Sequence, residues 1–210
     1  MYRKGLKRGI DFLLSSFALI LLWPLFILLA ILIKLDDPGP VFFRQKRVGV
    51  HKEYFNILKF RTMKMCTPHD TPTHLLENPD QYITRVGQIL RKTSLDELPQ
   101  IFQIWSGKMS IIGPRPALWN QFDLIELRDQ YGANDVRPGL SGWAQINGRD
   151  ELSIEVKAKL DGEYVQKMSF LFDVKCFFGT VWKVAKQEGV VEGNTGTAER
   201  EKASSGNIKL

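Results

Sequence analysis

The chain has 210 residues and a formal net charge of +6, from 29 Lys and Arg against 23 Asp and Glu. This length suits one domain with a substantial core, and the positive charge favours a polyanionic partner such as nucleic acid, anionic lipid or a phosphorylated small molecule. The two cysteines, Cys66 and Cys176, form no spacing pattern, which argues against a disulfide framework and indicates a reducing compartment.

The first predicted element is the apolar segment 12–33, which contains no charged residue and is long enough for a helix to cross roughly 30 Å of hydrocarbon. Pro24 lies near its centre and predicts a kink, because proline removes a helical hydrogen bond and clashes with the preceding turn. Basic residues flank both ends, which favours both flanks on the cytoplasmic side. We therefore favour a re-entrant helix, broken at Pro24, as the membrane anchor over residues 1–35. A single spanning helix is the alternative.

Turn residues at 36–40 end this helix, and short strands are expected at 41–43 and 54–61. The polar stretch 64–82 is expected to be an exposed loop. It contains Cys66, His69 and His74, but their spacing matches no zinc-binding pattern and no fourth ligand is evident. We therefore expect no zinc site there.

Helical periodicity dominates the rest of the chain. Apolar stripes predict short helices at 86–90, 98–105 and 122–131, and a longer amphipathic helix at 170–185. The last of these suits either packing on a core or lying in the membrane interface. The expected fold class is thus α+β and mostly helical: an anchor, a small cytoplasmic catalytic domain at 36–188 with short strands and interfacial amphipathic helices, and a loose tail at 189–210.

The segment 94–100, Ser-Leu-Asp-Glu-Leu-Pro-Gln, places two carboxylates side by side. Ser94 and Glu97 have the spacing of a helix capping box, which needs no catalytic meaning. If Pro99 instead begins the helix, Asp96 and Glu97 lie in the turn before it. In both cases the carboxylates lie at a helix N-terminus, which attracts phosphate and helps to keep Asp96 ionised as a nucleophile. Adjacent residues point in different directions, so one carboxylate suits attack on phosphorus and the other suits metal binding.

Three further segments carry cations beside turn residues. Arg115 stands between two prolines in 113–116, which predicts either a simple rigid turn or an arginine fixed to face a phosphate. Segment 137–149 is rich in glycine and bounded by arginines, and 59–63 places Lys59 and Arg61 at the end of a strand. Each signal is modest by itself.

Together, in this order and behind this anchor, these segments closely resemble the monotopic polyprenol-phosphate phosphoglycosyl transferases of the bacterial sugar transferase family. The resemblance runs from Lys7 to about Gly189 and is carried by segments 59–63, 94–100, 113–116 and 137–149. It implies transfer of a sugar 1-phosphate from a UDP-sugar to undecaprenyl phosphate or a similar carrier, with release of UMP. This would be the first membrane step of a bacterial glycan pathway, at the cytoplasmic face of the inner membrane.

The resemblance also implies residue roles. Asp96 would attack the β-phosphate and form a phosphosugar enzyme, while Glu97 would help Asp96 to bind Mg²⁺ and support proton removal. Arg91 and Arg115 match the phosphate-binding arginines. The residues expected to line the nucleotide or sugar region are Lys59, Arg61, Arg137, Gln145 and Arg149.

One departure from the family pattern lies at the helix break. Family members often carry Ser-Pro there, whereas this chain has Trp23-Pro24. The proline should preserve the break, but the tryptophan cannot satisfy the freed backbone as serine does. The sequence identifies neither the sugar, nor the glycan, nor the oligomeric state.

Two other function classes fit part of the pattern. A membrane-tethered nucleic-acid-binding module would explain the charge, but the arginines alternate with prolines and carboxylates and form no continuous basic stripe. We therefore expect no nucleic-acid partner. A metal-dependent glycosyltransferase acting on a lipid-linked glycan would also use a UDP-sugar, but it would release UDP.

Overall fold

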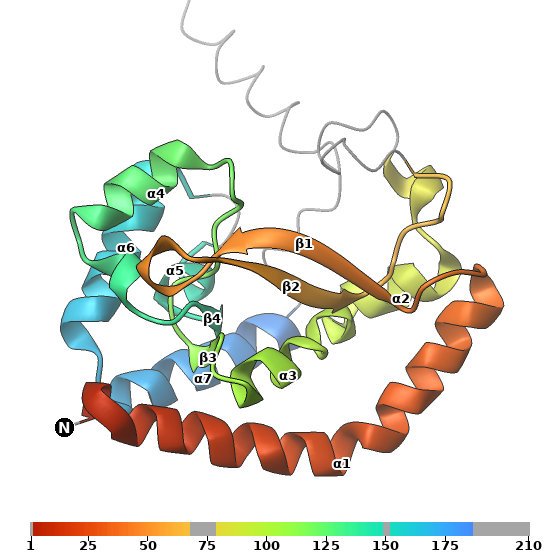
Figure 1. Ribbon diagram of the computed structural model, residues 1–210, viewed down its shortest axis with the longest axis horizontal. Helices are drawn as coiled ribbons and strands as arrows, with labels where there is room; N and C mark the ends of the chain where they lie inside the picture. Colours follow the sequence, from red (N-terminus) through yellow and green to blue (C-terminus); the bar gives the residue numbers. More distant parts are fainter. Residues whose placement is uncertain (1, 68–78, 149–151, 187–210) are drawn as a thin grey trace, which may run out of the picture.

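The computed structural model describes residues 2–67, 79–148 and 152–186 (Figure 1). This part of the chain is mostly helical with a few short strands, as expected. A π-helical turn, Tyr2–Leu6, leads into the long helix α1, Lys7–Asp36. The expected tail at 189–210, most of the loop between Thr67 and Pro79, and Arg149 lie outside the described residues; Cys66, at the start of that loop, is exposed.

Helix α1 stays helical through Pro24 and does not separate into two helices there. Figure 1 shows that its axis changes direction toward the C-terminal end. An interior proline costs about 3 kcal/mol, but packing holds the helix on the far side of it: Leu29 and Ile33 are buried in a cluster with Phe60 and Leu90. The expected break is thus a bend within one helix, and the re-entrant path stays a prediction.

The rest of α1 exposes large apolar side chains. Leu13, Ile20 and Leu21 are each more than 60% exposed, although they belong to a helix long and apolar enough to cross a membrane. An exposed apolar surface of this kind needs a nonaqueous neighbour. Helix α1 therefore fits a membrane anchor.

The predicted strands form an antiparallel hairpin of β1, Phe42–Val48, and β2, Tyr54–Phe60, which starts from the pair Phe42 and Phe60. Strand β1 extends well beyond the expected 41–43, because its later residues are mostly charged and gave no apolar alternation. A turn at Val50–Lys52 joins the strands, with His51 and Lys52 in the left-handed region.

Predicted helices appear as α2, α3, α4 and α7, whereas α5, α6 and the parallel strands β3 and β4 were not expected. Strand β3 pairs with β4, which lies much later in the chain. Short 3-10 turns occur at Pro79–Tyr82, Leu95–Glu97 and Ala133–Asp135. The bounds are α2 Arg85–Lys92, α3 Gln100–Trp105, β3 Ser110–Ile112, α4 Phe122–Asp129, β4 Gly139–Ser141, α5 Trp143–Ile146, α6 Ile154–Lys167 and α7 Phe170–Ala185.

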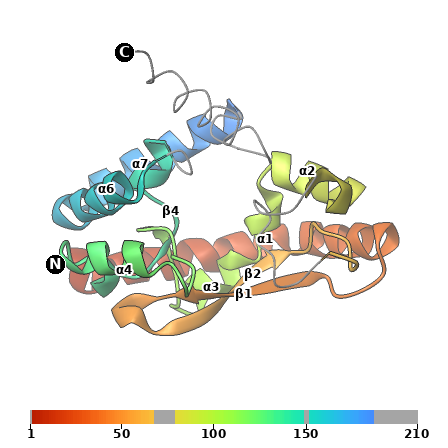
Figure 2. The same ribbon diagram turned by 90° about the horizontal axis from the view of Figure 1, so that it is seen from above.

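Helix α7 combines both environments proposed for it. Cys176 and Asp173 are buried, and Cys176 belongs to a core cluster with Ile112. In contrast, Leu171 and Trp182 are 78% and 62% exposed. Figure 2 shows α6 and α7 on one side of α1 and the hairpin on the other. The core contact of α7 is therefore narrow, and much of its apolar surface is exposed.

Candidate active site

The two carboxylates lie in a short turn directly before α3. Ser94 adopts the left-handed conformation with φ 57° and its side chain caps nothing, so the capping-box interpretation is wrong. Leu95–Glu97 form a single 3-10 turn, and Pro99 stands immediately before the first residue of α3. The carboxylates therefore occupy the entry turn before the helix, as the alternative expected, but the helix begins at Gln100, one residue after the proline.

Leucines on either side of the carboxylates fix this turn to the anchor. Leu95 and Leu98 pack against the cluster that contains Leu29 and Ile33 of α1 and Phe60 of β2. Their burial removes apolar surface from water, which is the main stabilising contribution available to such a short turn. The carboxylate pair is therefore tied to the C-terminal half of the membrane helix.

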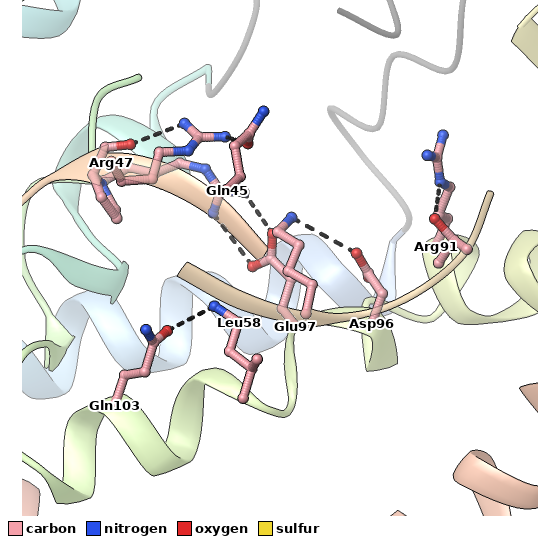
Figure 3. A network of polar contacts seen from close by, with 11 residues as sticks. Gln45, Arg47, Leu58, Arg91, Asp96, Glu97 and Gln103 are labelled. Atoms are coloured by element: carbon pink, nitrogen blue, oxygen red, sulfur yellow. Dashed lines mark hydrogen bonds and ion pairs between the residues drawn. The ribbon is translucent and has the colours of Figure 1, made fainter. Parts of the chain in front are cut away.

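Glu97 is held by two cations from separate elements (Figure 3). Lys59 Nζ donates to Glu97 Oε1 at 2.7 Å, and Arg115 Nη2 and Nη1 donate to Oε1 and Oε2 at 2.5 and 3.3 Å. Burial would raise the pKa of Glu97, but the charges and hydrogen bonds of Arg115 and Lys59 outweigh it and hold the pKa well below its usual range. Glu97 is therefore a fixed anion.

Asp96 is in a different state. Its Oδ2 lies 3.7 Å from Lys59 Nζ, and its side chain is 14% exposed. Burial raises the pKa of Asp96; Lys59 opposes this effect and the charge of Glu97 adds to it. Burial therefore opposes ionisation of Asp96, and its ionised state as a nucleophile stays a prediction. The neighbouring cations must supply the stabilisation of the anion.

Arg115 is positioned by a crossing of backbone segments. Gly113 N donates to Ser141 O at 2.8 Å, and Gly139 N donates to Pro114 O at 2.9 Å. The crossing leaves no room for side chains: a Cβ at Gly142 would lie 2.1 Å from Gly113 O. The glycines of segment 137–149 thus support the arginine turn from behind.

A second support for the Arg115 turn lies on β1 and was not expected from the sequence. Arg47 Nη1 donates to Pro116 O at 3.1 Å, and Nη2 donates to Gln45 Oε1 at 2.6 Å. Figure 3 shows Gln45 and Arg47 beside the Glu97 network. Both residues alternate along β1, so recognising the strand at its full length would have placed them on one face.

The other predicted residues are dispersed. Arg91 Nε donates to Thr62 Oγ1 at 2.9 Å, and its charge lowers the pKa of Asp96, so it belongs to the site. Arg61 is buried and pairs with Asp37 just after α1. This pairing gives Arg61 a structural role that the sequence did not indicate.

Within the described residues, neither Arg137 nor Gln145 makes a hydrogen bond to the carboxylate pair. Arg137 Nε donates to Gly107 O at 2.8 Å, beyond the C-terminal end of α3, whereas the carboxylates precede its N-terminal end. The amide of Gln145 is buried next to Gly142 and makes no hydrogen bond within the described ranges. Sequence spacing could not separate these residues from those that reach the site.

The donors present fit a magnesium ion in one specific way. Among the described residues there is no group of three or more potential metal ligands. The oxygens of Glu97 are already bound by Lys59 and Arg115, whereas no hydrogen bond to Asp96 is found in the described part of the chain. Mg²⁺ is often held by one or two carboxylates together with substrate phosphates and water. The pair fits such a site, with Asp96 as the more available ligand.

Comparison with known proteins identifies the family. The family model described as bacterial sugar transferase matches residues 2–187. The chain belongs to the bacterial sugar transferase family. The matched range includes both the apolar helix α1 and the turn that carries Asp96 and Glu97.

Three relatives illustrate the match. The chain is 40% identical over 196 residues to the uncharacterized sugar transferase EpsL of Bacillus subtilis, covering 93% of this chain and 95% of EpsL. It is 41% identical to the UDP-glucose:undecaprenyl-phosphate glucose-1-phosphate transferase of Escherichia coli, covering 85% of this chain and 40% of that protein. It is 40% identical to the UDP-N-acetylgalactosamine-undecaprenyl-phosphate N-acetylgalactosaminephosphotransferase of Aeromonas hydrophila, covering 84% and 43%. The chain thus spans less than half the length of the latter two.

Proposed function

We propose that this protein transfers a sugar 1-phosphate from a UDP-sugar to undecaprenyl phosphate, releases UMP and forms undecaprenyl-diphosphate-sugar. The observation that carries the proposal is the carboxylate pair gathered with Lys59 and Arg115 in a turn packed on the apolar helix α1. Relatives with 41% and 40% identity have names that specify this type of transfer, to undecaprenyl phosphate from UDP-glucose or UDP-N-acetylgalactosamine. The donor sugar of this chain is left open.

In the first step, an ionised oxygen of Asp96 attacks the β-phosphorus of the UDP-sugar. A bond forms between this oxygen and phosphorus, and the bond to the bridging oxygen breaks, so that UMP leaves with that oxygen. Lys59 lies within 3.7 Å of Asp96 and favours its anion. Fixed cations that face a phosphoryl group stabilise the charge of its transition state without reorganisation, a task that suits Arg91 and Arg115.

In the second step, a phosphate oxygen of the lipid carrier attacks the same phosphorus. The bond to Asp96 breaks, the carboxylate is restored and the product is the diphosphate-linked sugar. Splitting the transfer in this way lets a water-soluble donor and a lipid acceptor use one site in turn. A turn anchored to a membrane helix suits an acceptor that stays in the bilayer.

Glu97 keeps Lys59 and Arg115 in place and completes the negative side of the site. Asp96, assisted by Glu97, would hold Mg²⁺, which when bound neutralises phosphate charge. We place the site at the cytoplasmic face of the bacterial inner membrane, where UDP-sugars are available.

The decisive measurement is the nucleotide released. Purified protein is incubated with a panel of UDP-sugars, undecaprenyl phosphate and Mg²⁺, and UMP and UDP are separated. We expect UMP, and its loss in Asp96→Asn. Asp123→Asn is the matched control, since Asp123 is exposed on α4. Release of UDP, or full activity of Asp96→Asn, would contradict the mechanism.

Isotope exchange tests the two-step order independently. With the acceptor lipid omitted, labelled UMP should enter the UDP-sugar pool in wild-type protein, because the first step is reversible and forms a covalent intermediate. The exchange should vanish in Asp96→Asn. Exchange that requires undecaprenyl phosphate would indicate a single direct transfer instead.

A further inference from the structure

A cavity of about 560 Å³ lies at the N-terminal end of α1, apart from the carboxylate pair. None of its lining residues belongs to the turn that carries Asp96 and Glu97. It adjoins the loop after α3, whereas the carboxylates precede α3, and a six-residue helix is about 9 Å long. Its charged lining includes Arg3, Lys7, Arg8, Asp11, Asp135 and Arg137.

Several of these charges are committed to the fold. Lys7 Nζ donates to Asp173 Oδ2 at 2.5 Å. Arg8 donates to the carbonyls of Ile104 and Trp105 at 2.7 and 2.6 Å. Asp11 accepts from Ser110 Oγ and from the backbone N–H of Ile111. These contacts connect the walls of the cavity. Lys7, Arg8 and Asp11 therefore already have partners within the protein.

Two guanidinium groups keep donors for a ligand. Across the described residues, Arg3 has no hydrogen-bond partner and Arg137 uses only its Nε, which donates to Gly107 O. Gly107 has φ +84°, and a Cβ there would lie 3.2 Å from Arg8 Nη2. The loop therefore brings Arg8 and Arg137 together on one wall. Like charges held together in this way favour an anionic ligand between them.

The planar donor fork of arginine matches the oxygens of a phosphate group. The location indicates the source of that phosphate: Arg3, Lys7 and Arg8 directly precede the apolar run of α1, and Leu6 and Leu171 nearby in the fold are 56% and 78% exposed. Lipid headgroups carry their phosphates at this boundary, where basic residues are attracted to anionic lipids. A base-binding site would offer aromatic rings for stacking, and the described lining contains no Phe, Tyr or Trp.

We propose that this cavity binds the phosphate of an anionic phospholipid, with the acyl chains beside the exposed apolar side chains of α1 and α7. The site is separate from the proposed reaction centre and does not depend on the proposed reaction. It would hold the N-terminal end of α1 at the headgroup level, because Arg3 and Arg8 belong to the same short stretch as the start of that helix.

Native mass spectrometry of the full chain in a mild detergent tests the proposal. Titration with phosphatidylglycerol should show one tightly bound lipid, and phosphatidylcholine should bind more weakly. Arg3→Gln with Arg137→Gln should weaken phosphatidylglycerol binding by about fivefold for each charge removed. The matched control, Lys34→Gln with Lys92→Gln, removes two exposed charges outside the cavity and should leave the binding unchanged.

Three outcomes would overturn the proposal. Equal weakening in the two double variants would indicate unspecific surface charge. Equal binding of the two lipids would remove the role of the headgroup charge. Displacement of the lipid by excess inorganic phosphate, with equal binding of phosphate itself, would indicate a soluble anion as the ligand.

Arg3→Lys with Arg137→Lys keeps both charges and should retain most of the binding, which separates loss of the ligand contact from loss of folding.

Discussion

Two neighbouring carboxylates differ because they face different partners. Glu97 is bound by Lys59 and Arg115, while Asp96 lies at a longer distance, 3.7 Å, from Lys59. Two cations bring the pKa of Glu97 down, and burial brings the pKa of Asp96 up. A raised pKa means a more basic carboxylate, so the anion of Asp96 is the stronger nucleophile of the two.

This difference predicts opposite effects on stability. The pKa of Glu97 is lowered in the folded protein, so ionised Glu97 stabilises the fold. This contribution is fully present above pH 4.5, the pKa of a free glutamate, and is lost as pH falls through the lower folded-state pKa. Thermal unfolding in detergent should therefore show Glu97→Gln to be destabilised at pH 7, by about 3–5 kcal/mol because two cations lose their partner. The difference in unfolding free energy between the wild type and Glu97→Gln should shrink below pH 4.5. A deficit that is constant with pH would contradict the assignment.

For Asp96, the pH dependence of the contribution to stability has the opposite sign. Its raised pKa gives stability that is complete below pH 3.8, the value for a free aspartate, and is lost as pH rises through the folded-state pKa. Asp96→Asn should therefore be more stable than the wild type at pH 7, with Tm higher by about 2–4 °C for each kcal/mol gained. The inactive variant should be the more stable one. A lower Tm at pH 7 would show that the pairing with Lys59 outweighs burial.

Arg47 is predicted to position Arg115 without touching the reacting atoms. In Arg47→Lys the fork that joins Gln45 to Pro116 is lost, so the Arg115 turn loosens. Loss of a charged hydrogen bond costs about 1.5–3 kcal/mol, and we expect KM for the UDP-sugar to rise about tenfold or more with a smaller change in kcat. Arg44→Lys, on an exposed β1 position, is the control. Equal KM changes in both variants would remove the role of Arg47.

At the scale of elements, the two halves of α1 have different functions. The C-terminal half packs under the turn Leu95–Glu97 through Ile33, which is 3% exposed, whereas Ile31 is 52% exposed. Ile33→Ala should destabilise the protein by about 2–5 kcal/mol, as buried large-to-small substitutions do, and should lower kcat because the turn moves. Ile31→Ala makes the same chemical change without a cavity. Similar losses of Tm in the two variants would show that the packing is unimportant.

The elements that were predictable from the sequence have strong local signals. Helices α2, α3, α4 and α7 carry apolar stripes. Segment 94–100 and the turn around Arg115 are marked by distinctive patterns of charged residues and prolines. Strands β3 and β4 have only three residues each and pair across a long separation, so no local pattern marks them. Helix α6 was missed because charged residues and Gly162 interrupt its apolar positions.

Long-range pairing also decided which cations reach the site. Arg61 and Arg137 carry the same guanidinium group as Arg115, but Arg61 pairs with Asp37 and Arg137 donates to Gly107 O. These pairings depend on which segments the fold brings together. The sequence therefore indicated which residue types to expect, but it could not show which arginines lie beside the carboxylate pair.

At the scale of the whole molecule, large exposed apolar side chains occur on several helices. They include side chains of α1, Phe102 and Trp105 on α3, and Phe178 and Trp182 on α7, and these four aromatic side chains are each at least 40% exposed. Amphipathic helices of this kind lie in the plane of a membrane interface. Together with a carboxylate turn packed on α1, this distribution fits a membrane-associated protein.

The membrane path of α1 stays a prediction and can be tested directly. In a Cys66→Ser background, buried Cys176 should not react, and Arg3→Cys and Arg44→Cys each place one exposed thiol on one flank of the helix. If α1 is re-entrant, a membrane-impermeant maleimide should label neither thiol in intact spheroplasts and both after lysis. Basic residues on both flanks favour this result. Labelling of one flank from outside would establish a spanning helix, and the bend at Pro24 would then be a local adjustment within it.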